Sequence, residues 1–289
     1  MPSLAHRSQR DIVRVEGPDA GQFLQGQLSQ DVAGLAPGAA AWSLLLQPAG
    51  KVVAWLRVQR AGPEAFALDV DAGWGAAVEA RLRTFLLRTK ATITVEPGVP
   101  WLAVRGEPFD VEGALPPPGP GVVGADLIGT HAEHAAAPAG AVVVGDAGWQ
   151  AWRIRAGIPA LGAELTEATI PAEAGPWLVA ASVSFAKGCY TGQELVARID
   201  ARGGHVPRPI RVLEAEGPVT AGDVVRDGEG DVVGSVTSAA PAPDGAVALI
   251  PGRAVALAPL RRSVGVGARV LIRTSVGDVA AAVVEPAAT

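Results

Sequence analysis

The chain has 289 residues, of which 49% are hydrophobic and 18% are charged, and its formal net charge is −5. This length and hydrophobic content are enough for one large or two to three modest cores, so we expect a globular protein. The negative charge argues against general nucleic-acid affinity. No apolar run approaches the roughly 20 residues of a membrane span, so we expect neither direct nucleic-acid nor membrane binding.

The first part of the chain mixes strand-like and helix-like patterns. Val- and Leu-rich runs that end at Pro and Gly turns predict strands, and apolar residues about one turn apart predict helices. In chain order, these patterns predict a strand at 11–16, a helix opening after Asp19, strands at 42–46, 51–59 and 65–70, a helix at 73–87 and a strand at 91–96. Hairpins and crossovers are both present, which is typical of the α+β class.

Two irregular segments interrupt the middle of the chain. Residues 115–121 contain consecutive prolines and predict a loop, after which strands resume near Val122 and Val142. Residues 149–157 predict a helix. The stretch 159–176 is rich in Pro, Gly and Ala, and an irregular segment of that length in a compact domain is usually functional.

The pattern changes after Gly203-Gly204. From there to the end, short Val-rich runs are separated by turns such as Asp227-Gly-Glu-Gly230, which predicts a small β-barrel. We therefore expect residues 1–204 to form an α+β region of two interleaved subdomains and residues 205–289 to form a C-terminal β-barrel domain.

The octapeptide KGCYTGQE at 187–194 holds the only cysteine of the chain. Thr191 and Glu194 have the spacing of a capping box, so we expect a helix to start at Thr191. Within that helix, Leu195, Val196 and Ile199 would share an apolar face, and Arg198 would pair with Glu194 one turn earlier.

Cys189 would then lie just before the positive end of a helix, with Lys187 adding a second positive charge. Both features would stabilise a thiolate, and Gly188 and Gly192 would leave the backbone around it open. The alternative is that this cysteine is a small buried hydrophobe, and the residues alone leave the two possibilities about equal.

Several other chemistries are excluded by the sequence. It has no Gly-rich dinucleotide or phosphate-binding loop and no nucleophile elbow. One cysteine and four histidines do not form a dense metal-binding set, so we expect no metal site. An iron–sulfur cluster would need more thiolates than this chain has, although Cys189 could be one ligand of a cluster shared with a partner.

The octapeptide and its continuation, KGCYTGQELVAR, resemble the signature of the YgfZ-type folate-binding proteins, which are relatives of the glycine-cleavage T-protein (aminomethyltransferase). Other stretches agree in order and extend the resemblance over nearly the whole chain: FLQGQLSQDV at 23–32, LQPAGKV at 46–52, LLRTKATI at 86–93, RIRAGIP at 153–159, IPAEAG at 170–175 and GSVTS at 234–238. The resemblance implies a T-protein-like fold, in which α+β parts and a C-terminal barrel surround a central hole that holds tetrahydrofolate.

The resemblance also implies a role in making or maintaining iron–sulfur enzymes, including those that thiolate tRNA, with the family cysteine at Cys189. Two departures argue against aminomethyl transfer. The T-protein does not use this cysteine, and its segment matching RIRAGI carries a pterin-binding glutamate where this chain has Arg155, whose guanidinium offers only donors. The T-protein's essential aspartate matches either Asp69 or Asp71, and either could instead be an ordinary turn carboxylate at a strand end.

Tyr190 could stack on a flat ligand or merely pack, Gln193 could donate to the thiolate or face solvent, and Glu194 could simply cap its helix. Lys90, Lys51 and Arg208 are basic residues that could bind folate carboxylates, although such residues are more often solvated. The expected contacts of tetrahydrofolate, or of another folate derivative, are Gly188, Tyr190, Gly192, Gln193, Glu194, Asp69, Arg155, Lys90 and Arg208.

We therefore expect a cytoplasmic, tetrahydrofolate-binding protein that supports iron–sulfur cluster assembly or repair, with iron–sulfur enzymes or cluster-assembly proteins as partners. Cys189 would be its reactive or ligand thiol, assisted by Lys187 and facing a folate-sized cavity. One alternative is a folate-dependent aminomethyltransferase or demethylase, which would need a carboxylate at the reactive folate nitrogen. The other is a folate-binding scaffold whose cysteine is inert.

Overall fold

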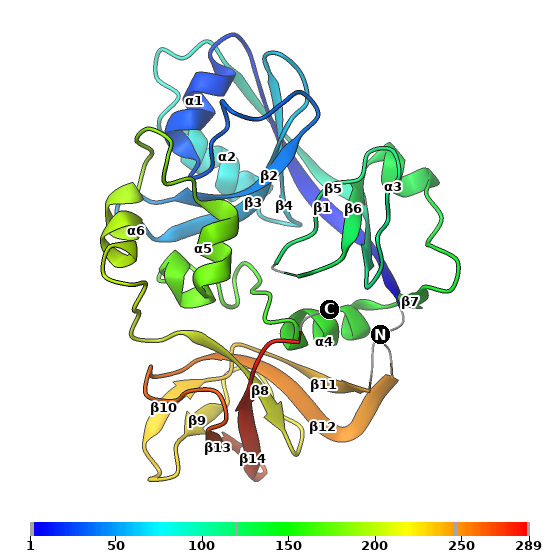
Figure 1. Cartoon of the computed structure of the whole chain (residues 1–289), viewed down its shortest axis with the longest axis vertical. Coiled ribbons are helices and arrows are strands. Elements are labelled where there is room, and N and C mark those ends of the chain that lie inside the picture. The colour runs from blue at the N-terminus through cyan, green and yellow to red at the C-terminus, as the bar shows by residue number, and fades with distance from the viewer. Residues whose placement is uncertain (1–2, 120, 245–247, 288–289) are drawn as a thin grey trace.

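The computed structural model describes residues 3–119, 121–244 and 248–287, so Pro120 of the predicted loop lies outside the described residues. Two curled sheets lie one above the other, with a helix between them (Figure 1). The predicted α+β class is confirmed.

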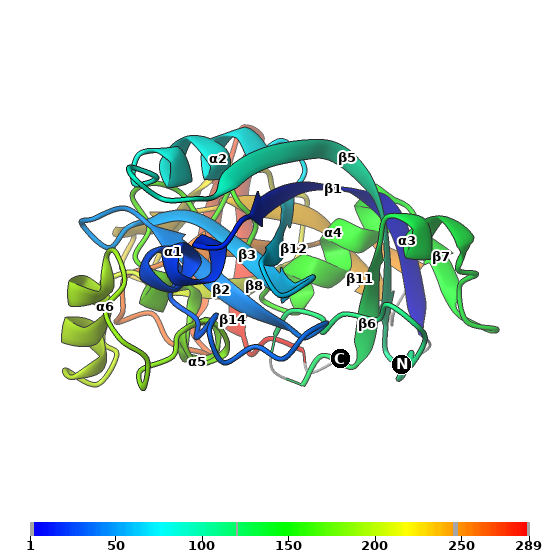
Figure 2. The ribbon, with the colours of Figure 1, turned by 90° about the horizontal axis from the view of Figure 1, so that it is seen from above.

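The first sheet contains the N-terminal strands. Its order is β2 (Ala40–Leu46), β3 (Val52–Arg60), β4 (Ala65–Asp71), β1 (Leu4–Glu16), β5 (Thr92–Arg105) and β6 (Gly124–Ile128), and β7 (Val142–Val144) pairs with β1. All neighbours are antiparallel except β7, which runs parallel to β1. The long strands β1 and β5 curve side by side across the molecule (Figure 2).

β1 and β5 are longer than the sequence predicted. Pairing runs from Leu4 opposite Arg105 to Glu16 opposite Thr92, with one irregularity between Arg10 and Ile12. The start of β1 carries polar residues that do not alternate with apolar ones, so the sequence pattern did not predict a strand there. Several of these polar side chains are buried in the structure, among them His6 and Arg10.

The second sheet is formed by the C-terminal strands. Its order is β10 (Val232–Ser235), β9 (Val224–Arg226), β13 (Arg269–Thr274), β14 (Gly277–Val284), β8 (Ile210–Ala215), β12 (Ala248–Pro259) and β11 (Ser238–Asp244). An isolated bridge between Gly234 and Leu260 brings β10 to the end of β12, so the sheet curls around its own apolar core. A division near residue 204 remains our proposal.

The helices are short. They are α1 (Ala20–Gln27), α2 (Gly75–Arg83), α3 (Thr130–His134), α4 (Asp146–Arg155), α5 (Pro176–Ser182) and α6 (Gln193–Asp200), together with a 3-10 turn at Pro171–Ala174. The predicted helix at 73–87 spans Gly75–Arg83 and so ends early. Beyond it Leu86 packs against the core, but Phe85 and Leu87 are exposed, so a further turn would bury little apolar surface. In the described residues, no helix is long and apolar enough to cross a membrane.

Helix α4 lies between the two sheets (Figure 1). Ala151 and Ile154 pack against Val212 and Leu257 of the second sheet. Trp152 belongs instead to the large core under the first sheet. One short helix therefore contributes to both halves of the molecule, and the cavity described next lies beside it.

Candidate functional site

A cavity of about 410 Å³ lies between the first sheet and α4. Its walls hold five of the seven tryptophans of the chain. They come from β2, β3, β5 and α4, and they are Trp42, Trp55, Trp101, Trp149 and Trp152. The sequence analysis missed this site because four separate elements supply the five tryptophans. The available signals were the spacing of Trp149 and Trp152 on one helix and the excess of tryptophan over other aromatic residues.

The indole rings form two pairs. Trp42 and Trp55 lie with ring centroids 4.5 Å apart, and Trp149 and Trp152 lie 4.7 Å apart. His6 stacks on Trp149 at 5.0 Å with an angle of 10° between the rings, and its Nδ1 lies 3.1 Å from the carbonyl oxygen of Val144. These walls are flat, apolar and rich in π electrons, which suits a planar heteroaromatic ligand.

Hydrogen bonds fix the first pair of indoles. Trp55 Nε1 donates to Ser182 Oγ at 2.9 Å, and Trp42 Nε1 donates at 3.2 Å to the carbonyl oxygens of Pro116 and Pro117. The proline-rich loop therefore lies against the cavity wall, and its carbonyl groups hold Trp42 in place.

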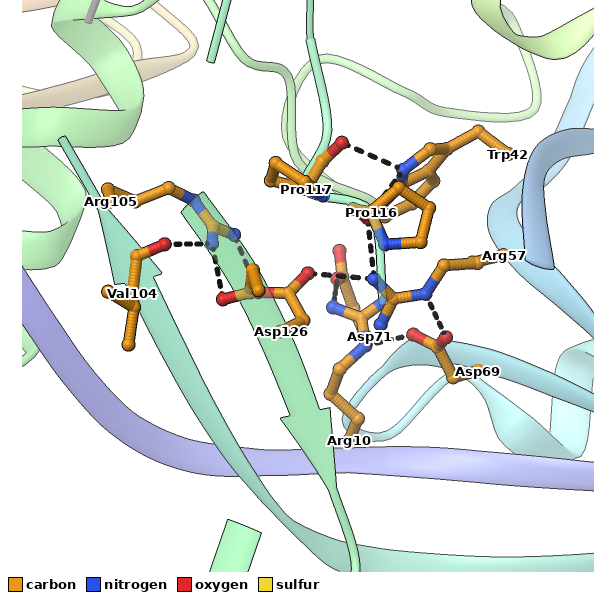
Figure 3. A network of polar contacts seen from close by, with 11 residues as sticks. Arg10, Trp42, Arg57, Asp69, Asp71, Val104, Arg105, Pro116, Pro117 and Asp126 are labelled. Atoms are coloured by element: carbon orange, nitrogen blue, oxygen red, sulfur yellow. Dashed lines mark hydrogen bonds and ion pairs between the residues drawn. The ribbon is translucent and has the colours of Figure 1, made fainter. Parts of the chain in front are cut away.

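Three arginines and three aspartates form an ion-pair chain beside the cavity (Figure 3). In order, the pairs are Asp71–Arg10 at 2.9 Å, Arg10–Asp69 at 2.6 Å, Asp69–Arg57 at 2.7 Å, Arg57–Asp126 at 2.9 Å and Asp126–Arg105 at 2.7 Å. The formal charges cancel. Such a chain is tolerated in a protein interior because every charge has a partner.

Asp126 shows how the pairing works. Burial alone would raise the pKa of the Asp126 carboxyl, but the adjacent Arg105 and Arg57 guanidiniums outweigh burial and hold the pKa below its ordinary value. Asp126 is therefore ionised at neutral pH, and the network stays neutral as a whole.

The structure separates Asp69 from Asp71, which the sequence could not. The Asp69 side chain is 6% exposed and is paired with both Arg10 and Arg57. The Asp71 side chain is 41% exposed and lines the cavity, pairing only with Arg10 and receiving a long bond from the Leu161 amide at 3.4 Å. Of the two, Asp71 is the carboxylate that lines this cavity, where Asp126 and Asp146 are also lining residues.

Arg153 is a cavity residue to which the sequence analysis assigned no role. It donates to Glu164 Oε2 at 3.1 Å, to the Ile158 carbonyl at 2.7 Å and to Ser238 Oγ at 3.0 Å. Glu164 in turn accepts a bond from Thr237 at 2.6 Å. The segment GSVTS thus anchors the second sheet to the cavity wall.

Cys189 lies at the surface and is not among the residues that line this cavity. Its sulfur receives a bond from Gln193 Nε2 at 3.8 Å, while Gln193 Oε1 accepts from the Tyr190 amide at 3.0 Å. Cys189 was expected to face a folate-sized cavity, and the structure does not place the thiol against the cavity described here. Gln193 does donate to the sulfur, which is one of the two roles predicted for it.

The predicted capping box is wrong. Helix α6 begins at Gln193, two residues later than predicted, and its N-cap is Gly192 with φ of 85°. The Thr191 hydroxyl instead faces the Gly26 carbonyl and Gln27 Oε1, at 3.5 and 3.4 Å. The expected pair between Glu194 and Arg198 is present, and Val196 is buried as expected.

Position 192 requires a glycine because the start of α6 approaches the Leu46–Gln47 backbone closely there. A Cβ atom there would lie 2.6 Å from the Gln47 carbonyl oxygen and 2.8 Å from the Leu46 Cβ. The start of α6 therefore rests directly on the LQPAGK turn. Gly188 has open space around it instead.

The remaining predicted contacts lie away from the cavity lining. Arg155 pairs with Glu214 at 3.0 Å and donates to the Glu285 carbonyl at 2.7 Å, so it joins α4 to the second sheet. Lys90 and Arg208 are exposed, and Lys51 donates to the Ala168 carbonyl at 2.7 Å. Arg155, Lys90 and Arg208 therefore do not line this cavity.

Lys187 is half-buried, and its ammonium donates to backbone carbonyls at the end of α1. Burial lowers the pKa of Lys187 to about 8, with a smaller opposing effect from Asp31. Burial raises the pKa of its neighbour Tyr190 to about 12. Across the described residues, no group of three His, Cys, Asp or Glu side chains is placed to hold a metal ion.

Comparisons with known proteins agree with the sequence motifs. No family model matches the chain. An uncharacterized protein of Haemophilus influenzae is 28% identical over 209 residues, which are 71% of each chain. The tRNA-modifying protein YgfZ of Edwardsiella ictaluri is 29% identical over 67% of this chain, and a mitochondrial iron–sulfur cluster assembly factor IBA57 homolog of Neurospora crassa is 24% identical over 69%.

This chain spans 65% of the Edwardsiella relative and 51% of the Neurospora relative. Among solved structures, the glycine cleavage system aminomethyltransferase T of Bartonella henselae superposes with a TM-score of 0.78 at 21% identity, covering 98% of this chain and 85% of that one. At this identity the match establishes the fold alone.

Proposed function

We propose, on the premise that this chain is a relative of the YgfZ-type proteins with the fold of the T-protein, that it binds tetrahydrofolate or a related folate and supports iron–sulfur cluster assembly or repair. The observation that carries the proposal is the tryptophan-lined cavity beside α4. The Cys189 thiol would act separately from this cavity, at the surface of the protein, toward a partner protein.

The cavity residues fit a folate. A pterin and a benzoyl ring are flat and would stack on the paired indoles. The edge of a pterin presents N–H donors, and the partly exposed Asp71 carboxylate is an acceptor suited to them. The cavity volume of about 410 Å³ lies within the roughly 300–1,000 Å³ of ordinary ligand sites.

Cys189 suits a role in a shared complex. It is exposed, and it is the only cysteine of the chain, so it could supply one ligand to a cluster whose other ligands come from a partner. Iron–sulfur enzymes and cluster-assembly proteins are the partners we propose, including enzymes that modify tRNA. A lone thiol would stay reduced in the cytoplasm, where we place the protein.

Asp71 supports a second candidate, a folate-dependent one-carbon transferase or demethylase. Such an enzyme needs a carboxylate in the cavity, and Asp71 is available there. Turnover of a one-carbon folate by the purified protein, abolished in Asp71→Asn, would favour this candidate.

Calorimetric titration with tetrahydrofolate tests the proposal. We expect the wild type and Cys189→Ser to bind with similar micromolar affinity, because the thiol is not in the cavity lining. Asp71→Asn should bind about tenfold more weakly or worse, since a charged acceptor is lost. No binding by the wild type would refute the folate site.

Complementation of a strain that lacks the corresponding protein tests the thiol. We expect Cys189→Ser to fail to restore iron–sulfur enzyme activity although it binds folate. Full activity with Cys189→Ser would refute the thiol mechanism and leave a folate-binding scaffold.

A further inference from the structure

The segment that carries Cys189 is bonded along its length to the end of α1. Ser29 Oγ donates to the Ser182 carbonyl at 2.7 Å, and the Ser184 amide donates to the Ser29 carbonyl at 3.0 Å. Further along, the Thr191 amide donates to the Gly26 carbonyl at 3.0 Å. We call residues 184–191 the thiol loop and residues 25–30 its cradle.

Lys187 makes the central contact between loop and cradle. Its Nζ donates to the carbonyl oxygens of Gln25, Leu28 and Gln30 at 2.6, 2.7 and 2.9 Å. The Gln25 carbonyl belongs to the last turn of α1, where helix carbonyls lack partners within the helix and favour a cation, and the other two carbonyls lie just beyond the helix. The Tyr190 ring, with its centroid 5.3 Å from Nζ, provides a further favourable contact with the ammonium.

The ammonium group is fully used by these contacts. An ammonium has three N–H donors, and three carbonyls accept from it. Because the pKa of Lys187 stays at about 8, the side chain is mostly protonated at pH 7 and can make all three bonds. It therefore has no donor left for the Cys189 sulfur, which receives the Gln193 amide instead.

We propose that Lys187 is a positioning residue, whose three bonds to the cradle hold the thiol loop against α1 and present Cys189 at the surface. This inference rests on the proposed function only in taking Cys189 as the working thiol. It gives the segment FLQGQLSQ a role that the folate cavity does not supply, since its last residues are the cradle. The sequence analysis had assigned Lys187 to activation of the thiol.

Hydrogen exchange at pH 7 tests the proposal without folate or a cluster. The variants are Lys187→Met and, as a matched control, Lys51→Met, since Lys51 donates to a single carbonyl. In Lys187→Met we expect the protection of residues 184–191 to fall about tenfold, because three partly buried carbonyls lose their donor. Lys51→Met should leave the loop unchanged, and strand β3 should stay protected in both variants.

The alkylation rate of the single cysteine separates positioning from activation. Positioning predicts that the rate for Lys187→Met at pH 7 stays within about threefold of the wild type. A tenfold slower reaction with unchanged loop protection would assign Lys187 to thiol activation and overturn the proposal. The only tyrosine provides a second signal, because 3-fluorotyrosine at position 190 should shift its resonance in Lys187→Met and not in Lys51→Met.

If Lys187→Met does not fold, Lys187→Arg keeps the charge but cannot direct three donors from one nitrogen to three converging carbonyls. Reduced protection confined to the loop in Lys187→Arg would support positioning, and wild-type protection would overturn it. Failure of the proposed function would appear differently, as full cellular activity of Cys189→Ser. That outcome would not change the hydrogen-exchange result for Lys187.

Discussion

Replacing Arg57 with methionine should destabilise the protein by about 3–5 kcal/mol, because it removes one cation from a buried network with balanced charges. The Arg57 side chain is fully buried and bonds to Asp69 at 2.7 Å, to Asp126 at 2.9 Å and to the Pro116 carbonyl at 2.7 Å. In the variant, three aspartates would share two arginines, and the loop carbonyl would lose its donor.

Urea denaturation followed by tryptophan fluorescence and far-UV circular dichroism would measure this loss. Arg14→Met is the matched control, because Arg14 and Glu96 form an ion pair whose side chains are 40% and 44% exposed, and its removal should cost less than about 1 kcal/mol. Equal effects of the two substitutions would refute the reasoning. Adding Asp69→Asn to Arg57→Met should restore part of the stability, because the pairs Asp71–Arg10 and Asp126–Arg105 then remain and the charges balance again.

The remaining predictions concern pH and backbone geometry. Because the pKa of Asp126 is held below its ordinary value, its contribution should be present at neutral pH and lost as the pH falls below about 4, and Asp126→Asn should flatten that part of the stability curve. One of the three lysines should titrate near pH 8 in ¹³C-lysine NMR, and its signal should be missing from Lys187→Arg; three midpoints near 10.5 would contradict this. Since the unfolded chain then binds more protons, the free energy of unfolding should rise between about pH 8 and 10.5. Gly192→Ala should destabilise by about 2 kcal/mol or more in thermal denaturation, whereas Gly188→Ala should be nearly neutral.

Local patterns predicted most of the strands and helices, together with the identity of the thiol motif, because both depend on residues close in the sequence. The ion network was missed because it depends on strand register. Arg57 lies opposite Asp69 across β3 and β4, and Arg10 lies opposite Asp71 across β1 and β4. Nothing in the sequence shows which charged residues of separate strands become neighbours.

The prediction of where α6 starts was wrong for a related reason. The spacing of Thr191 and Glu194 allows a capping box, but the close contact of Gly192 with the Leu46–Gln47 backbone determines where the helix begins. Tertiary contact thus overrode a local signal. The same contact explains why the LQPAGK turn and the thiol motif are spatial neighbours although well over a hundred residues separate them.

Ser182 joins the cavity to the thiol loop. Its hydroxyl accepts the Trp55 indole N–H of the cavity wall at 2.9 Å, and its carbonyl accepts the Ser29 hydroxyl of the cradle at 2.7 Å. The residue is fully buried, so neither bond can be replaced by one to bulk water without a rearrangement. A ligand that displaced Trp55 would therefore disturb Ser182, whose bond to Ser29 lies just before the thiol loop. Coupling between the two sites requires such a shared element, and exchange of residues 184–191 with and without tetrahydrofolate measures whether Ser182 transmits it.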